Sequence, residues 1–270
     1  MKAFDLLADW PATTVAAGVI DDQGDHRHGP NVSVPLSLAS VTKPLTAMAV
    51  MVAVEEGLVE LESTAGPPHS TVRHLLSHAS GLAADQRRLM TEPGTRRIYS
   101  NSAYDVLGDL VAEQSEMTFD DYFHEALSPL GLERTLLSGS PAHGAISTVA
   151  DLLKVAQCLL SSDGTLLDSS TMDEMTTPTF PDLPGVLPGY GLQAPNSWGL
   201  GVEIRGTKSP HWTGSANSPG TFGHFGRAGG FLWVDREANM AVAVLTDRDF
   251  GDWVSEIWPR FSDAVLAELG

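Results

Sequence analysis

The tetrapeptide Ser40-Val41-Thr42-Lys43 contains the residue pair with the clearest chemical potential in this sequence. On a helix, residues three positions apart share a face, so the Ser40 hydroxyl and the Lys43 amine can meet. Serine is a weak nucleophile unless a base lies beside it, and a lysine buried against an apolar helix can lose its proton and act as that base. The same residues also fit an N-cap serine followed by a lysine that reaches solvent, so the tetrapeptide alone leaves both interpretations open.

Two later motifs carry groups that could join this pair. Tyr99-Ser100-Asn101 precedes a predicted helix; the Tyr99 hydroxyl can share a proton with Lys43, and the Asn101 amide can hold a substrate carbonyl. By itself this tripeptide also fits a tyrosine packed on the core and an asparagine in a turn. Gly223-His224-Phe225-Gly226 lies on a predicted strand, where glycines indicate either a bulge or close approach of a ligand along the strand edge.

Hydrophobic periodicity predicts the elements that must position these motifs. The helix over 40–57 is apolar nearly all round, which is typical of a helix buried at the centre of a fold. Further helices are predicted over 71–78, 119–128, 148–160 and 252–269, and another begins at 102. Strands are predicted over 13–20, 32–38, 198–204, 220–225, 230–234 and 240–246. Strands therefore lie at both ends of the chain, with helices between them.

The simplest assembly of these elements is an α/β (α+β) fold. One antiparallel sheet is built from both termini with flanking helices, and a mostly helical subdomain is inserted in the middle. We expect residues 1–65 to form the first part of the α/β subdomain, 66–190 the helical subdomain and 191–270 the second part of the α/β subdomain. The three segments would form one compact unit with the active site between the subdomains.

In this order the three motifs resemble those of the serine β-lactamase and penicillin-binding-protein superfamily, most of all the class C β-lactamase-like branch with its relatives, the DD-peptidases and family VIII carboxylesterases. The flanking segments resemble the family too, among them LASVTKPLTAMAVMVAVEEGLVEL, EPGTRRIYSNSAYDVLGDLVAE and FGHFGRAGGFLWVDREANMAVAVLTDR. The resemblance covers roughly residues 12 to 265. Three ordered motifs with matching flanks are far more specific than any one of them.

The resemblance implies a role for each matched residue. Ser40 is the nucleophile, Lys43 its base partner and Tyr99 the second acid/base group. Asn101 holds a substrate carbonyl. His224 and Gly226 line the edge strand, and the backbone N–H groups of Ser40 and Arg227 form the oxyanion hole. Acylation of Ser40 and hydrolysis of the acyl-enzyme would follow.

The sequence departs from the family pattern at His224. β-Lactamases and DD-peptidases usually carry lysine there, and its charge binds the substrate carboxylate. A histidine is mostly neutral at pH 7 from its reference pKa of about 6.5. The departure favours esters or other amides over β-lactams, although Arg227 could restore positive charge.

Other chemical sites find less support in the sequence. No G-x-S-x-G is present, and GHFGRAGG does not open a helix after a strand, so neither a nucleophile elbow nor a dinucleotide loop is predicted. His74 and His78 have metal-ligand spacing, but the glutamate of H-E-x-x-H is missing, and we predict no metal or other cofactor. A basic island of four arginines precedes Tyr99 and is either a solvated surface or a patch that steers anionic substrates; its members are Arg87, Arg88, Arg96 and Arg97.

Composition limits the partners of the chain. Its 270 residues carry 16 Lys and Arg against 34 Asp and Glu, a net charge of −18, which disfavours nucleic acid and anionic membranes. The single Cys158 excludes an internal disulfide. The N-terminus lacks a long apolar segment, so we expect a cytoplasmic protein, with a monomer favoured although its oligomeric state is left open.

These observations together predict a serine hydrolase that acts on a small-molecule ester or amide. Cleavage of small esters with weak β-lactamase activity is the leading hypothesis. A true β-lactamase and a D-amino-acid peptidase or amidase are the alternatives within the same chemistry. A catalytically idle penicillin-binding or scaffold protein is the alternative from another class, against which the three intact motifs argue.

Overall fold

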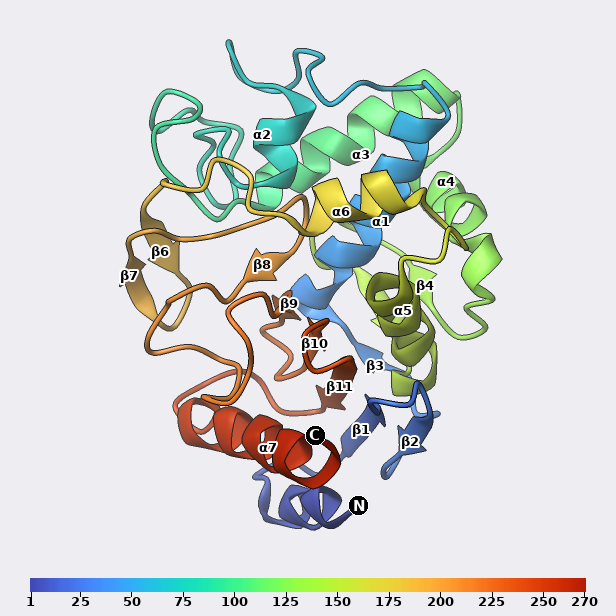
Figure 1. Ribbon diagram of the computed structural model, residues 1–270. Coiled ribbons are helices and arrows are strands. Elements are labelled where there is room, and N and C mark those ends of the chain that lie inside the picture. Colours follow the sequence, from blue (N-terminus) through green and yellow to red (C-terminus); the bar gives the residue numbers. More distant parts are fainter.

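A computed structural model describes residues 1–270 and contains a six-stranded antiparallel sheet built from both ends of the chain (Figure 1). The strand order is β2-β1-β11-β10-β9-β8. The N-terminal part supplies β1 (Val15–Ile20) and β2 (His26–His28), and the C-terminal part supplies β8 (Glu203–Ile204), β9 (Phe222–Phe225), β10 (Phe231–Asp235) and β11 (Met240–Thr246). β1 pairs with β11 from Val15 opposite Thr246 to Ile20 opposite Ala241, so the two termini meet at the centre of the sheet. The predicted fold class is confirmed.

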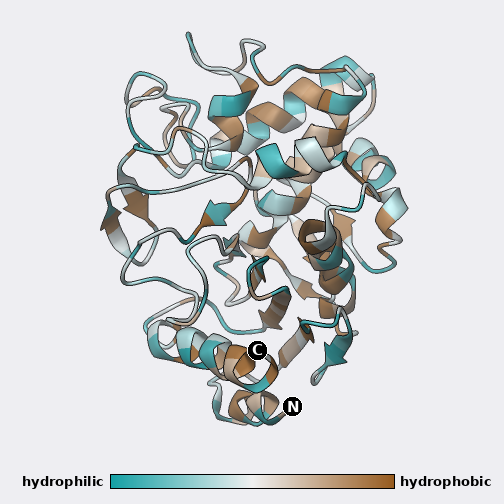
Figure 2. Ribbon diagram, in the orientation of Figure 1, coloured by the Kyte–Doolittle hydropathy of each residue, from teal (hydrophilic) through white to brown (hydrophobic).

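The central strands are buried on both faces because the side chains alternate between two separate cores. On β11, Ala241, Ala243 and Leu245 belong to the larger core, whereas Val242 and Val244 belong to the smaller one. Figure 2 shows that the inner strands β10 and β11 are apolar, whereas the edge strand β2 is polar.

Helices cover the two faces of the sheet. On one face lies α7 (Val254–Leu269), joined to the N-terminal 3-10 helix η1 (Lys2–Asp9) through Glu268, whose carboxylate accepts hydrogen bonds from the Lys2 and Ala3 N–H groups, each at 2.8 Å. On the other face lies α5 (Val149–Ser161), which packs against β1, β10 and β11. Packing from both sides excludes water from the central strands.

The remaining helices gather around α1 (Thr42–Glu55), which runs from the sheet into the upper part of the molecule in Figure 1. Its side chains are buried on nearly every face, as the sequence predicts. Around α1 lie α2 (Val72–Leu76), α3 (Asn101–Ser115), α4 (Phe119–Ala126) with the 3-10 turn η3 (Ser128–Leu130), and α6 (Ser169–Thr176). None of the helices combines the length and apolar character that crossing a bilayer requires.

The structure differs from the predicted elements in several places. Only β3 (Leu36–Ser37) forms within 32–38, and it joins a small sheet with β5 (Ala145–Ser147) and β4 (Leu136–Leu137) instead of the main one. Of the strand predicted over 198–204, only β8 forms. Residues 185–193, for which no strand is predicted, form a two-stranded ribbon of β6 (Gly185–Leu187) and β7 (Gly191–Gln193). Helix α3 begins one residue early because Ser100 caps it, accepting a hydrogen bond from the Ala103 N–H at 3.1 Å.

Candidate active site

Ser40 lies in a strained turn at the entrance of α1. The 3-10 turn η2 (Ala39–Val41) leads directly into the helix, and Ala39 adopts φ +43°, a left-handed conformation that costs a non-glycine residue free energy. The end of β9 packs tightly on this turn. A Cβ atom at Gly226 would lie 2.5 Å from the Leu38 carbonyl oxygen and 3.2 Å from the Ser40 nitrogen, so this position requires glycine.

Lys43, one turn further along α1, is fully buried. Its Nζ donates hydrogen bonds to Asn101 Oδ1 at 2.7 Å and to the Ala142 carbonyl at 3.0 Å, and it lies 4.6 Å from the centroid of the Tyr99 ring. Burial lowers the pKa of Lys43 to about 7, while the charges of Asp105 and Asp85 act in the opposite direction. A neutral amine has two N–H donors and one lone pair. Because the two acceptors occupy both donors, the lone pair of neutral Lys43 remains free.

Tyr99 lies beside Ser40 in a buried aromatic cluster. Burial raises the pKa of Tyr99, and a side-chain hydrogen bond to Ser40 acts in the opposite direction, so the phenol keeps its proton at neutral pH. The His78 ring packs 4.6 Å from the Tyr99 ring, and its Nδ1 accepts the Ser100 N–H at 3.1 Å. Of these two side chains, Lys43 is therefore the one able to accept a proton at neutral pH, and Tyr99 the one able to donate it.

Asn101, the first residue of α3, connects Lys43 to a carboxylate that the sequence motifs do not contain. Its Oδ1 accepts from Lys43, and its Nδ2 donates to Asp85 Oδ1 at 2.7 Å. An amine donor on one side and a carboxylate acceptor on the other fix the orientation of the amide. One Nδ2 hydrogen remains for another acceptor, as the role predicted for Asn101 requires.

His224 is buried, with 2% of its surface exposed, and its two ring nitrogens have different surroundings. Nδ1 lies 2.6 Å from the Phe225 carbonyl, which can only accept, so Nδ1 carries the proton. Burial, together with Lys43, lowers the pKa of His224 to about 3. Nε2 is therefore an unprotonated acceptor at neutral pH, and no group of the protein donates to it. The imidazole cannot replace a lysine as an anion binder.

Two backbone N–H groups near the serine are free, one from η2 and one from the turn after β9. Neither the Ser40 N–H nor the Arg227 N–H donates to another group of the protein, whereas the neighbouring Gly226 N–H is bonded to the Gly230 carbonyl at 2.8 Å. The turn is held from behind by the Phe250 N–H, which donates to the Arg227 carbonyl at 2.7 Å. The Arg227 side chain is exposed and forms no ion pair.

The predicted side chains meet at one cavity of about 720 Å³. Ser40, Tyr99, Asn101, His224 and Arg227 line it, Gly226 packs against the serine turn, and Lys43 lies in the wall behind Asn101. The other residues that line the cavity belong to none of the three sequence motifs or were not predicted to lie at the site. These are Ser37, Ala39, Asp85, His143, Leu187, Pro188, Gly189, Trp198, Phe225 and Phe250. The apolar ones come largely from the β6–β7 turn and an aromatic cluster around Phe225, which exclude water beside the serine.

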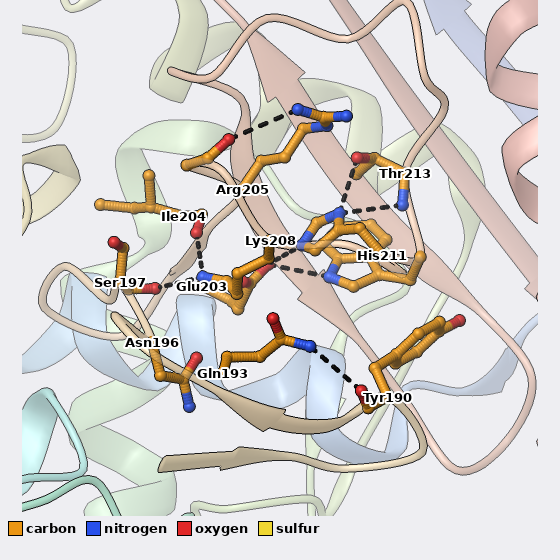
Figure 3. A network of polar contacts seen from close by, with 12 residues as sticks. Tyr190, Gln193, Asn196, Ser197, Glu203, Ile204, Arg205, Lys208, His211 and Thr213 are labelled. Carbon is orange, nitrogen blue, oxygen red and sulfur yellow. Dashed lines mark hydrogen bonds and ion pairs between the residues drawn. The ribbon is translucent and has the colours of Figure 1, made fainter. Parts of the chain in front are cut away.

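A buried ionic network supports the strand next to His224 (Figure 3). Glu203 on β8 lies opposite Gly223 of β9 and accepts hydrogen bonds from His211 Nε2 at 2.9 Å and Trp212 Nε1 at 2.8 Å. Its other oxygen lies 2.5 Å from Lys208 Nζ. Burial alone would raise the pKa of Glu203, but His211 and Lys208 hold it at about 2. The network fixes the edge strand from behind the cavity.

The basic island is not a single surface patch, because Arg97 is buried and structural. Its guanidinium donates to the carbonyls of Asn196 at 2.5 Å and Ser77 at 2.6 Å, and also to those of Thr179 and Phe180. Arg87 pairs instead with Asp109 on α3. The interpretation of the four arginines as a solvated or substrate-steering surface is therefore wrong for Arg97, whose hydrogen bonds join three segments of the chain. A guanidinium has five N–H donors, so it can bind several carbonyls at once.

Known proteins share this fold and sequence pattern. Residues 16–266 match the family described as Beta-lactamase. A β-lactamase from Mycobacterium bovis, known from its crystal structure, is 52% identical, with a TM-score of 0.95 over 99% of each chain. The D-alanyl-D-alanine-carboxypeptidase/endopeptidase AmpH of Escherichia coli (strain K12) is 26% identical in an alignment 225 positions long, which covers 56% of this chain and 58% of AmpH. The chain thus spans little more than half the length of that curated relative.

A more distant likeness concerns the fold alone. EstCE1, described as a hydrolase with promiscuous acyltransferase activity, is 17% identical, with a TM-score of 0.81 over 98% of each chain. Proteins described with different activities therefore share this architecture, so the fold alone does not identify the reaction.

Proposed function

This chain belongs to the Beta-lactamase family of serine hydrolases, and on that premise we propose that it hydrolyses small esters through an acyl-enzyme on Ser40 and turns over β-lactams slowly. The observation that carries the proposal is the protonation of His224. The Phe225 carbonyl holds the only proton of the imidazole on Nδ1, so Nε2 is a buried acceptor that can donate nothing to a substrate.

The contacts of Ser40, Lys43 and Tyr99 support the following acylation steps. Ser40 Oγ attacks the ester carbonyl carbon, and its proton passes to neutral Lys43, whose lone pair is free. The negative oxygen that develops is stabilised by the N–H groups of Ser40 and Arg227, which have no other acceptor. Tyr99 donates a proton to the departing alkoxide and recovers one from Lys43. Water then attacks the acyl-enzyme by the reverse proton transfers, which release the acid and restore Ser40.

A substrate carboxylate finds no donor at His224. A lysine in this place would offer a charge-assisted hydrogen bond, which contributes about 1.5–3 kcal/mol, against about 1 kcal/mol for a neutral one. Uncharged esters do not need this anchor, so they lose nothing from the histidine.

A true β-lactamase is the second candidate, and two observations favour it. The relative from Mycobacterium bovis, 52% identical, is described as a β-lactamase. Arg227 also supplies an exposed, unpaired cation in the cavity, which could hold a substrate carboxylate. A D-amino-acid peptidase remains a third candidate through the similarity to AmpH.

The deciding experiment compares kcat/KM for p-nitrophenyl butyrate and nitrocefin at about pH 7.5. We expect the wild type to prefer the ester and His224→Lys to shift the ratio about tenfold toward nitrocefin. The matched control is His143→Lys, which adds the same charge to an exposed position of the same cavity and should leave the ratio nearly unchanged. Preference of the wild type for nitrocefin would favour the second candidate, with Arg227 as the carboxylate anchor.

A further inference from the structure

Two acceptors in the cavity have no part in the acyl-transfer steps. Asp85 Oδ2 forms no hydrogen bond, and His224 Nε2 is buried without a donor. Both residues line the same cavity as Ser40. Of the two, only Asp85 is exposed, so a ligand that enters the cavity can donate a hydrogen bond to its free oxygen. The unpaired carboxylate thus favours a substrate that carries a donor.

Asp85 lies next to Asn101, the residue that the proposed mechanism assigns to the substrate carbonyl. Asp85 belongs to the loop between α2 and α3, and its Oδ1 accepts from the Asn101 amide at 2.7 Å. No Lys, Arg or His pairs with its carboxylate, and the side chain is exposed. The only guanidinium of the lining, Arg227, comes from a different segment, the turn after β9.

We propose that Asp85 makes the cavity selective for substrates whose acyl group carries a protonated amine. The inference rests on the proposed function and specifies its substrate class. An ammonium group reaching Asp85 gains a charge-assisted hydrogen bond, whereas an apolar group of the same size there leaves the carboxylate unpaired. The net charge of −18 adds a weaker, general attraction for cations.

A purely positioning role for Asp85 makes a different prediction. If its carboxylate only orients the Asn101 amide, its removal slows all esters by the same factor. If it also binds the substrate cation, its removal slows cationic esters more than neutral ones. The ratio of two kcat/KM values separates these roles, because effects on Asn101 and Lys43 cancel in it.

The test uses the full chain with p-nitrophenyl 6-aminohexanoate and p-nitrophenyl heptanoate, which have acyl groups of nearly equal length and differ in charge. At low salt the wild type should favour the amino ester about three- to fivefold in kcat/KM, the range of an exposed ion pair. Asp85→Asn should bring the ratio to about one, and 0.5 M NaCl should weaken the wild-type preference. The matched control is Asp109→Asn, an exposed acid outside the cavity lining, which should keep the wild-type ratio.

A wild-type ratio near one, or an unchanged ratio in Asp85→Asn, overturns the inference. Equal loss of the preference in both asparagine variants also overturns it, since the general charge of the protein would then be the cause. Turnover of the neutral ester by Ser40→Ala tests the proposed function separately from the selectivity of Asp85. Turnover that survives this substitution refutes the proposed function, whereas Ser40-dependent turnover without amine preference refutes the selectivity of Asp85 alone.

Discussion

Replacing Asp105 with asparagine should move the pH dependence of ester hydrolysis to lower pH. Asp105 on α3 opposes the burial that lowers the pKa of Lys43, and Asp85 acts in the same direction as Asp105. The other groups around the amine are the rings of Tyr99 and Tyr104 and the two imidazoles of His78 and His224. Without the charge of Asp105, burial lowers the pKa of Lys43 further, so the amine becomes neutral at a lower pH.

The magnitude follows from the pKa of about 7 for Lys43. If only the neutral amine accepts the Ser40 proton, about 1% of the enzyme is active at pH 5, about 9% at pH 6, about half at pH 7 and about 90% at pH 8. A downward shift of about one unit would raise the active fraction at pH 6 to about half, a gain of roughly fivefold.

The assay is kcat/KM for p-nitrophenyl butyrate between pH 5 and 8.5, corrected for spontaneous hydrolysis. Asp109→Asn is the matched control, because Asp109 lies on the same helix but pairs with exposed Arg87. We expect the acidic limb to have its midpoint near pH 7 in the wild type and control, and below it in Asp105→Asn. A wild-type kcat/KM that still rises steeply at pH 8.5, or the same midpoint in all three proteins, would refute the assignment of Lys43 as the base.

Three further substitutions test the supports of the site. Gly226→Ala should lower kcat on the order of a hundredfold while the melting temperature changes little, because the new Cβ would move the Ser40 turn and its N–H group away from the oxyanion. An unchanged kcat would contradict this. Glu203→Gln should cost about 3–5 kcal/mol in urea unfolding by leaving Lys208 buried and unpaired. The wild type should lose this stabilisation as pH falls from 4.5 toward 2, whereas the variant should lack that part of the acid transition. Arg97→Lys should destabilise by about 2–4 kcal/mol, since one ammonium cannot reach the four carbonyls; wild-type stability would show that they do not need a guanidinium.

The sequence was sufficient to predict the fold class and the convergence of three motifs on one cavity. Apolar α1 and the alternating strands β10 and β11 follow patterns that burial imposes directly, so their positions could be read from periodicity. The Ser40 and Lys43 spacing is likewise local, because a helix turn fixes it.

Features that depend on long-range contacts could not be predicted. Arg96 and Arg97 are indistinguishable by type, and only the fold shows that Arg97 is buried among carbonyls from three segments. Asp85 is a single acid in a polar loop, and its importance comes from contact with Asn101, sixteen positions away. The protonation of His224 likewise depends on the orientation of one carbonyl, which no sequence pattern encodes.

The role of Ser40 is tested most directly by its replacement with alanine, using p-nitrophenyl butyrate turnover and covalent labelling by a fluorescent penicillin. Ser37→Ala, which removes a hydroxyl from the same cavity three residues earlier, is the matched control. We expect Ser40→Ala to abolish labelling and to reduce turnover by a factor on the order of ten thousand to a million, with an unchanged circular dichroism spectrum, while Ser37→Ala remains active. A folded Ser40→Ala protein that retains a tenth of wild-type turnover would contradict the acyl-enzyme mechanism.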